Sequence, residues 1–252
     1  MRLVIGHLYP DHMSIYGDRG NVIALTRRAQ WAGMDVELRP IGPGEEGNLT
    51  SLDLLFMGGG QDKEQALIAD DLVRYKAASL RAAAADGLPI LAICGGYQLL
   101  GHYFRTGERG TLPGIGVFDA WTVAGSRRCI GDCLVESDLA GEMRTIVGFE
   151  NHSGQTYLGE GARPLGRVLV GYGNNSRDRQ EGAVQRNAVG AYLHGALLPK
   201  NPWLADWLLR QALLRRYGRA DLPALDDTVE EEAHRAVIAR IRRRGRVRSG
   251  AI

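Results

Sequence analysis

Short apolar runs alternate with longer amphipathic segments over the first two thirds of the chain. The runs at residues 3–5, 34–38, 52–57 and 90–93 have the length of buried strands. The segments between them carry apolar residues at helical spacing, and a further core strand is expected at 188–193. Because strands that alternate with helices build parallel sheets covered on both faces, the pattern predicts an α/β fold with a mostly parallel central sheet flanked by helices.

The predicted helices connect these strands. They are expected at residues 22–32, 62–85, 96–103 and 202–217. Gly33 directly follows the first of them, where a glycine commonly ends a helix.

The pattern changes after Gly107, where glycines punctuate short apolar pieces up to residue 170. We expect these pieces to add antiparallel strands to the same domain. The chain would then have a main domain over residues 1–220 and a C-terminal helical, basic tail over residues 221–252. The arginine-rich end is expected to be a solvated, frayed terminus, with docking to a partner as the alternative.

Composition and charge exclude several classes of protein. The 31 Lys and Arg residues against 29 Asp and Glu residues leave a net charge of +2, too small for a nucleic-acid-binding protein. No apolar run approaches membrane-spanning length, so we expect no membrane insertion. The three cysteines, Cys94, Cys129 and Cys133, form neither a CxxC pair nor a zinc-binding spacing, so we expect no metal site and a cytoplasmic, reducing location.

Cys94 stands where the apolar run at 90–93 ends and two glycines begin the next helix. A residue in this place lies at the carboxyl edge of a parallel sheet, where ligands bind in open α/β folds. The glycines permit a sharp turn, as in a nucleophile elbow, and the positive end of the helix favours the thiolate. This stretch alone fits a nucleophile and a buried structural cysteine about equally well.

Three further features support a nucleophile. Residues 58–60 are glycines at the end of the preceding strand, and the N–H of Gly60 with that of Gly95 would form an oxyanion hole. His194 also stands at a strand end before a glycine, which suits a general base that reaches Cys94. Gln98 lies one helical turn after Cys94, on the face that points back toward it.

Together these motifs resemble those of class I glutamine amidotransferases. The sequence has GGGQD at 58–62, CGGYQ at 94–98 and LHG at 193–195, in the same order as that class. The resemblance implies a flavodoxin-like fold, L-glutamine as the substrate, and Cys94 with His194 as the catalytic pair. Many members carry an acid where this chain has Ala196, and the departure resembles the cobyric-acid-synthase-like (CobB/CobQ) branch, whose E-x-H-x-G segment is similar to residues 150–154.

That departure leaves the third member of a catalytic triad open. His194 would act in a pair with Cys94 alone, or would take a carboxylate from Asp18, Glu150 or Asp132. Asp18 belongs to the segment DRGN. We narrowly prefer a role for Asp18 as the cap of a helix to a catalytic role.

The N-terminal segments narrow the resemblance. LYPDHM at 8–13 and YGDRGN at 16–21 are similar to the small, stand-alone GatD-type subunits of lipid II isoglutaminyl synthases. In that family an arginine before an Ile-Gly-Asp segment holds the glutamine, which implies Arg128 here, with Arg127 as the alternative. Taken without the family, the two arginines would be a surface pair.

The resemblance also implies how ammonia would be used. The sequence has no G-x-x-x-x-G-K-[ST] phosphate-binding loop, so we expect no cofactor on this chain. ATP and Mg²⁺ are expected on a MurT-type, Mur-ligase-like partner that forms a heterodimer with the chain and amidates the D-glutamate α-carboxyl of lipid II. The alternatives are a glutaminase for another acceptor such as a corrinoid precursor, a cysteine hydrolase of related fold, and a non-enzymatic subunit.

Overall fold

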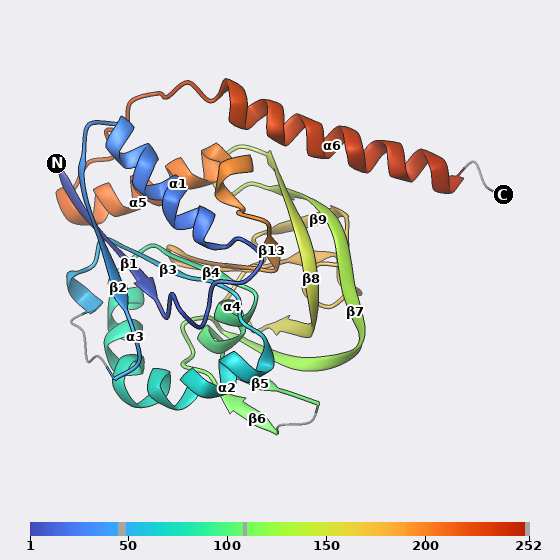
Figure 1. Ribbon diagram of the computed structural model, residues 1–252, viewed down its shortest axis with the longest axis horizontal. Helices are drawn as coiled ribbons and strands as arrows, with labels where there is room; N and C mark the ends of the chain where they lie inside the picture. Colours follow the sequence, from blue (N-terminus) through green and yellow to red (C-terminus); the bar gives the residue numbers. More distant parts are fainter. Residues whose placement is uncertain (45–48, 108–109, 250–252) are drawn as a thin grey trace.

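A mostly parallel sheet forms the centre of the protein (Figure 1). The computed structural model describes residues 1–44, 49–107 and 110–249, without the side chains of residues 245–249. Within this part, the six strands follow the order β11-β12-β4-β3-β1-β2, and only β11 runs antiparallel to its neighbour. Their bounds are β1 (Arg2–Leu8), β2 (Asp35–Ile41), β3 (Leu54–Met57), β4 (Ile90–Ile93), β11 (Ala183–Gln185) and β12 (Ala188–Ala191). The α/β fold predicted from the sequence is confirmed.

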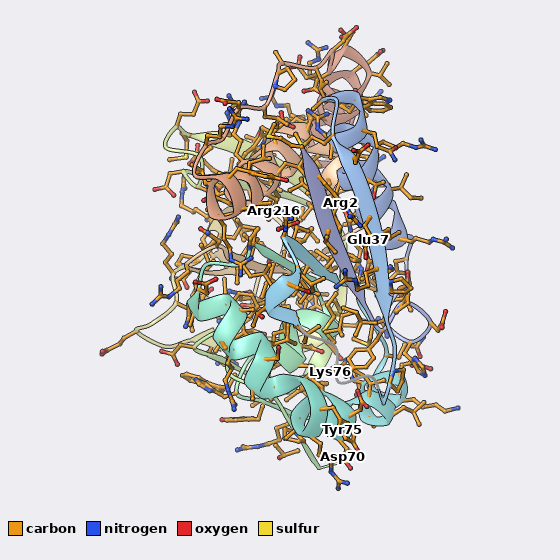
Figure 2. The ribbon with its side chains drawn as sticks, turned by 90° about the vertical axis from the view of Figure 1, so that its left-hand side faces the viewer. Arg2, Glu37, Asp70, Tyr75, Lys76 and Arg216 are labelled. Carbon is orange, nitrogen blue, oxygen red and sulfur yellow. The ribbon has the colours of Figure 1, made fainter. Side chains whose placement is uncertain are left out.

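The position of each strand in the sheet explains its sequence. All residues of β3 and β4 are buried, because helices cover both faces of the central strands, and both strands are continuous apolar runs. Strand β2 lies at the edge and carries alternating charged residues that discourage pairing with another chain. One of them, Glu37, binds Arg2 of β1 at 2.6 Å (Figure 2).

Helices cover both faces of this sheet (Figure 1). Helices α1 (Arg19–Trp31) and α5 (Pro202–Tyr217) pack together on one face, and α2 (Asp62–Asp71) and α3 (Ala77–Ala85) lie on the other. The helix predicted over residues 62–85 is continuous, but a π-helical segment, η2 (Leu72–Lys76), joins its two halves. At the end of η2 the buried Lys76 ammonium pairs with Asp71 and lies 5.2 Å from the centre of the Tyr9 ring (Figure 2).

A second sheet of seven strands within the described residues packs beside the first. Its main part is a long hairpin of β7 (Ala120–Ser137) and β8 (Arg144–Leu158). The other strands are β5 (Tyr103–Arg105), β6 (Thr111–Pro113), β9 (Gly166–Val170), β10 (Gln180–Glu181) and β13 (Leu193–His194). The helix predicted over residues 96–103 is shorter in the structure. Helix α4 (Gly95–Leu100) ends at Leu100, and Tyr103 begins β5.

The prediction that this region adds antiparallel strands is confirmed by the pairing of β7 with β8. These two strands are longer than the apolar pieces in the sequence, because some glycines, among them Gly148 and Gly154, lie inside them. A Cβ atom on Gly148 would lie 2.7 Å from the Leu193 Cβ, and one on Gly154 would lie 2.3 Å from the Gln98 side-chain nitrogen. These glycines therefore mark close packing against neighbouring elements and do not end a strand.

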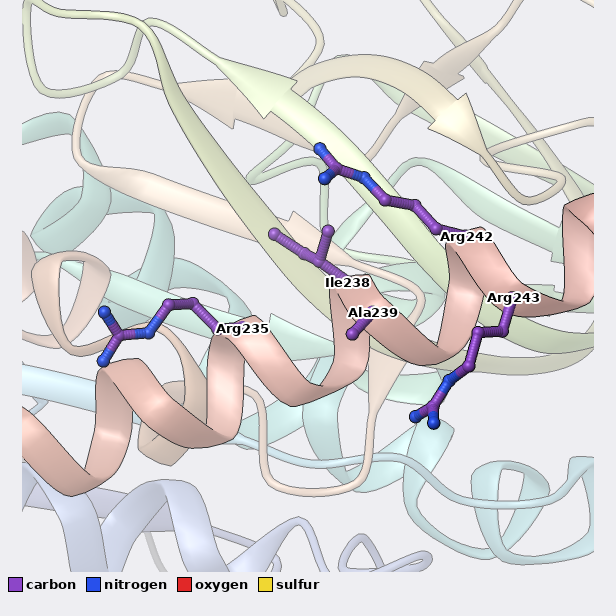
Figure 3. A pocket seen from close by; sticks show the side chains of 5 residues that line it. All are labelled: Arg235, Ile238, Ala239, Arg242 and Arg243. Carbon is purple, nitrogen blue, oxygen red and sulfur yellow. The ribbon is translucent and has the colours of Figure 1, made fainter.

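Helix α6 (Thr228–Ser249) crosses the outer side of β7 and β8 (Figure 1). Its Val237 and Ile241 pack on Leu134 and Val147 in a small second core. Other side chains of the helix, among them Arg235, Arg242 and Arg243, line a shallow hollow on its surface (Figure 3). The proposed domain boundary near residue 220 stays a prediction, and residues 250–252 of the predicted tail lie outside the described residues. None of the described helices has both the length and the apolar character that a membrane span requires.

The parallel strands end at one common edge of the central sheet. The segments that follow β1, β3, β4 and β12 carry Asp18, the glycines 58–60, Cys94 and His194. The fold therefore brings the predicted site residues to the place where open α/β sheets bind ligands.

Candidate active site

Cys94 lies at the sharp turn between β4 and α4. Its backbone has φ 49° and ψ −104°, a conformation that a residue with a side chain adopts only under strain. Its N–H donates to the Ala191 carbonyl at 2.8 Å, and its carbonyl accepts the N–H of Gln98 at 2.9 Å. The strained turn is thus held between β12 and the first turn of α4, as in a nucleophile elbow.

The backbone of the glycine segment 58–60 packs directly against this turn. A Cβ on Gly95 would lie 2.8 Å from the carbonyl oxygen and 2.9 Å from the nitrogen of Gly60. The N–H of Gly96 donates to the Gly58 carbonyl at 3.1 Å. The backbones of Gly60 and Gly95 are therefore adjacent next to Cys94, where their N–H groups can face a developing oxyanion, and their role in the oxyanion hole stays a prediction.

His194 is fully buried and interacts with two acidic groups. Its Nδ1 lies 3.1 Å from Oδ1 of Asp18, and the Cys94 sulfur is close enough to affect its ionisation. Burial alone would lower the pKa of His194, but the charge of the Cys94 thiolate and the Asp18 carboxylate outweigh it and raise the pKa to about 10. The ring therefore holds a proton at neutral pH, as expected for an imidazolium paired with a thiolate.

The prediction that Asp18 caps a helix is wrong. Asp18 is the N-cap residue of α1, but its side chain makes no capping hydrogen bond. Instead Oδ2 accepts the N–H of Gly59 at 2.8 Å while Oδ1 faces His194, and the whole residue is buried. The carboxylate thus holds the His194 ring through Nδ1, which is the geometry of the third member of a catalytic triad, and a catalytic role for Asp18 stays a prediction.

The start of α1 fits against the turn that follows His194. A Cβ on Gly20 would lie 2.6 Å from the Cβ of Ala196, and the Asn21 side-chain oxygen accepts the Leu198 N–H at 2.9 Å. Ala196 itself has φ 46°. Because Gly20 has no Cβ, Ala196 packs closely against the start of α1, and a larger side chain at position 196 would crowd this contact.

Arg127 and Arg128 point to different neighbours. Arg128 donates to the side-chain oxygen of Asn151 at 2.8 Å and to the Tyr16 hydroxyl at 3.2 Å. The Tyr16 ring contacts His194 edge-on, with 5.0 Å between ring centres. Arg127 instead lies over the Tyr172 ring and donates to its hydroxyl at 3.1 Å. Tyr16 thus lies between Arg128 and His194, whereas Arg127 contacts Tyr172. The choice of Arg128 over Arg127 as the residue that holds glutamine stays a prediction.

Gln98 lies beneath the site in a buried chain of hydrogen bonds. Its oxygen accepts from Gln65 at 3.0 Å, and Gln65 also donates to the Gly60 carbonyl at 3.0 Å. Its nitrogen donates to the Tyr192 hydroxyl at 3.1 Å. Both ends of the amide therefore have protein partners, which links α4 to the glycine segment, and direct contact of Gln98 with glutamine stays a prediction.

The two other carboxylates considered for the triad have different partners. Glu150 accepts the backbone N–H groups of Tyr172 and Gly173, and Asp132 binds Arg240 and Arg244 of α6. Neither faces His194 through a hydrogen bond in the described part of the chain. The described residues also contain no group of three or more His, Cys, Asp or Glu side chains placed to bind a metal ion.

Sequence comparison agrees with this geometry. Residues 4–202 match the CobB/CobQ-like glutamine amidotransferase domain, GATase_3. The chain belongs to the CobB/CobQ-like glutamine amidotransferase family. The matched range contains the glycine segment 58–60, Cys94 and His194, and the catalytic roles of these residues stay predictions.

Relatives within the family match nearly the whole chain. The glutamine-hydrolysing GatD subunit of lipid II isoglutaminyl synthase from Staphylococcus aureus is 41% identical over 246 residues, which cover 98% of this chain and 99% of the relative. The corresponding Streptococcus pneumoniae subunit is 39% identical and covers 92% of this chain and 88% of its own length. A cobyric acid synthase from Pelotomaculum thermopropionicum is 38% identical over 64% of this chain, but the match covers only 32% of that protein.

Solved structures confirm the fold. PurLQS from Thermotoga maritima aligns with a TM-score of 0.57 at 18% identity and covers 77% of this chain and 88% of its own. A glutamine amidotransferase from the same organism aligns with a TM-score of 0.53 at 17% identity, over 93% of both chains. These likenesses support the class I amidotransferase fold that the sequence predicted.

Proposed function

We propose that the protein is the glutaminase subunit of a lipid II isoglutaminyl synthase. The observation that carries the proposal is the near full-length match to two GatD subunits in a chain whose Cys94, His194 and Asp18 converge at one sheet edge. The cobyric acid synthases extend far beyond their match with this chain. The match covers 99% and 88% of the two GatD subunits but 32% of the cobyric acid synthase, so the GatD subunits are the better guide to function.

The residues of the site support hydrolysis of glutamine through a thioester. The α-carboxylate of glutamine binds the planar guanidinium of Arg128. The Cys94 thiolate attacks the side-chain amide carbon, and the N–H groups of Gly60 and Gly95 stabilise the oxyanion. As the C–N bond breaks, His194 transfers its proton to the leaving nitrogen, and ammonia departs.

The second half of the reaction restores the enzyme. His194, now neutral, takes a proton from a water molecule that attacks the thioester. The C–S bond breaks, glutamate leaves, and the proton returns the imidazolium to its pair with the Cys94 thiolate. Asp18 holds the ring through both halves, because its carboxylate bonds Nδ1 and leaves Nε2 for proton transfer.

The ammonia would be used by a second subunit. The sequence has no phosphate-binding loop, and the GatD relatives are named as subunits of a synthase. We infer a heterodimer with a MurT-type, Mur-ligase-like partner that binds ATP and Mg²⁺ and activates the D-glutamate α-carboxyl of lipid II. Ammonia then converts this carboxyl to the amide, with the reaction placed in the cytoplasm during peptidoglycan synthesis.

Cys94→Ala tests the proposed chemistry. We expect the variant to fold normally and to release no ammonia from L-glutamine, alone or with the partner, because it lacks the nucleophile. Free ammonium should still support amidation of lipid II by the complex, since the partner is intact. Ammonia release at the wild-type rate would remove Cys94 from the mechanism. Amidation of a corrinoid in place of lipid II would overturn the proposed acceptor.

Replacement of each neighbouring arginine tests the substrate contact. Arg128→Ala should raise the KM for glutamine by about tenfold or more with a smaller effect on kcat, because a charge-assisted contact to the α-carboxylate is lost. Arg127→Ala serves as the matched control and should leave the KM nearly unchanged. The opposite pattern in steady-state glutaminase kinetics would transfer the role to Arg127.

A further inference from the structure

Tyr16 lies in a tight turn directly before Asp18. The Asp18 N–H donates to the Ile15 carbonyl at 3.1 Å, and the two residues between them, Tyr16 and Gly17, have φ 53° and 81°. Positive φ at both central positions is typical of a type I′ turn. A tyrosine is uncommon in this conformation, which glycine, asparagine and aspartate adopt more easily. The turn alone therefore does not explain why residue 16 is a tyrosine.

Both ends of this turn are bound to Gly59. The Ile15 N–H donates to the Gly59 carbonyl at 3.2 Å, and the Gly59 N–H donates to Oδ2 of Asp18 at 2.8 Å. Gly59 directly precedes Gly60, one of the two residues of the proposed oxyanion hole. The backbone of Tyr16 is thus fixed relative to the glycine segment.

The Tyr16 side chain connects two parts of the candidate site. Its ring contacts His194 edge-on, with 5.0 Å between ring centres, and its hydroxyl accepts a hydrogen bond from Nη2 of Arg128 at 3.2 Å. Because the residue is 43% exposed, its ring gains only part of the free energy of a buried aromatic side chain. Packing alone therefore does not account for a tyrosine in a strained conformation.

Arg128 is held by two neutral acceptors. Its Nε donates to the side-chain oxygen of Asn151 at 2.8 Å, and Nη2 donates to the Tyr16 hydroxyl. Nε and Nη2 lie on one edge of the planar guanidinium group, so the two bonds together fix its plane. Among the described residues, Nη1 has no hydrogen-bond partner and no carboxylate forms an ion pair with Arg128. The positive charge is therefore oriented without being neutralised.

We propose that the Tyr16 hydroxyl positions Arg128 to bind the α-carboxylate of L-glutamine. The inference rests on the proposed glutaminase function and adds a residue to the substrate site. With Asn151 and Tyr16 on one edge of the guanidinium, the edge formed by Nη1 and the second N–H of Nη2 faces away from them and can bind both oxygens of a carboxylate. Tyr16 is then a positioning residue, which acts on the substrate only through Arg128.

Tyr16→Phe removes the hydroxyl and keeps the ring beside His194. We expect the KM for L-glutamine to rise about fivefold, because the guanidinium loses one of its two fixed contacts. The kcat should stay within about twofold of the wild-type value, since Cys94 and His194 are unchanged. Tyr172→Phe is the matched control, because it removes the hydroxyl that accepts from Arg127 at 3.1 Å and should leave the KM unchanged. Thermal unfolding of both variants reports on the fold.

A double-mutant cycle tests whether the hydroxyl acts through Arg128. In the Arg128→Ala background, Tyr16→Phe should cause no further rise in the KM for glutamine. A full fivefold rise in that background would mean that the hydroxyl contacts glutamine itself, and it would overturn the positioning role. A lower KM in the single variant Tyr16→Phe would also overturn it, because the hydroxyl would then compete with the carboxylate for Arg128.

The outcomes separate this inference from the proposed function. A wild-type protein that releases no ammonia from glutamine, alone and with the proposed partner, would refute the function itself. An active wild type whose KM equals that of Tyr16→Phe would refute the role of Tyr16 alone.

Discussion

The residues of the candidate site show how strongly one side chain can change the ionisation of another. His194 is completely buried, a condition that by itself favours the neutral ring. Its raised pKa therefore depends on the negative charges of Cys94 and Asp18. Asp18 contributes both a charge and a hydrogen bond, and it also binds the N–H of Gly59. One carboxylate thus supports the proton donor and the glycine segment at the same time.

Asp18→Asn should change the pH dependence of the reaction. In the wild type His194 keeps its proton up to about pH 10, so kcat/KM should fall as the pH rises through that value. Without the carboxylate the imidazolium is less stable, its pKa is lower, and the fall should begin at a lower pH. We also expect at least a tenfold loss of kcat/KM near pH 7.5, because the ring loses its orientation. Asp11→Asn, on the exposed part of the same loop, is the control, and an unshifted alkaline limb in Asp18→Asn would contradict the assigned role.

Sequence reasoning could place some of these residues and not others. Cys94 and His194 stand at strand ends before glycines, a local pattern that is visible without coordinates. Asp18 has no such pattern, because an aspartate before a helix is equally typical of a cap and its partner is 176 residues away.

The elements around the site are held together by close backbone contacts. The turn at Cys94 and the glycine segment 58–60 approach so closely that no side chain fits between Gly95 and Gly60. The same principle explains why β7 and β8 are longer than the apolar pieces in the sequence, since glycines such as Gly148 lie inside them. Glycine signals a turn or a close approach with equal strength, and the sequence alone does not distinguish the two.

Gly95→Ala should impair catalysis more than stability. The added Cβ would lie 2.8 Å from the Gly60 carbonyl oxygen, so the glycine segment must move and the two N–H groups lose their common target. We expect kcat for glutaminase activity to fall by about two orders of magnitude, in line with the loss of one oxyanion donor. Gly107→Ala is the matched control, because its Cβ would lie 4.0 Å from the nearest atom. Equal kcat values for both variants would mean that the segment has no part in oxyanion binding.

At the scale of the whole molecule, α6 joins elements that lie on either side of the site. Arg240 and Arg244 bind Asp132 of β7 at 2.7 and 3.0 Å. The His234 ring bonds the Lys200 carbonyl, and the Lys200 ammonium donates to the carbonyl of Gly195 at 2.7 Å. The sequence predicted a helix here with a solvated basic end, and it missed these pairs because the acidic partner is more than a hundred residues away.

Ile241→Asp should release α6 from the body. Ile241 is 6% exposed, and a carboxylate in its place would be buried among apolar side chains at a cost of several kcal/mol unless the helix moves away. We expect trypsin to cleave within α6 at least tenfold faster, while the remaining domain resists cleavage. Ala239→Asp, on the exposed side of the same helix, should behave like the wild type. Equal cleavage rates for the wild type and Ile241→Asp would show that the small second core does not hold α6.

The place of α6 in the chain also affects how the protein is made. The ribosome synthesises this segment after every described strand of both sheets. Leu134, Val147 and the Asp132 carboxylate therefore face water until α6 has emerged. A nascent chain that stalls before residue 228 would present an apolar strip beside an unneutralised charge, which makes incomplete chains easy for chaperones and proteases to distinguish from finished ones.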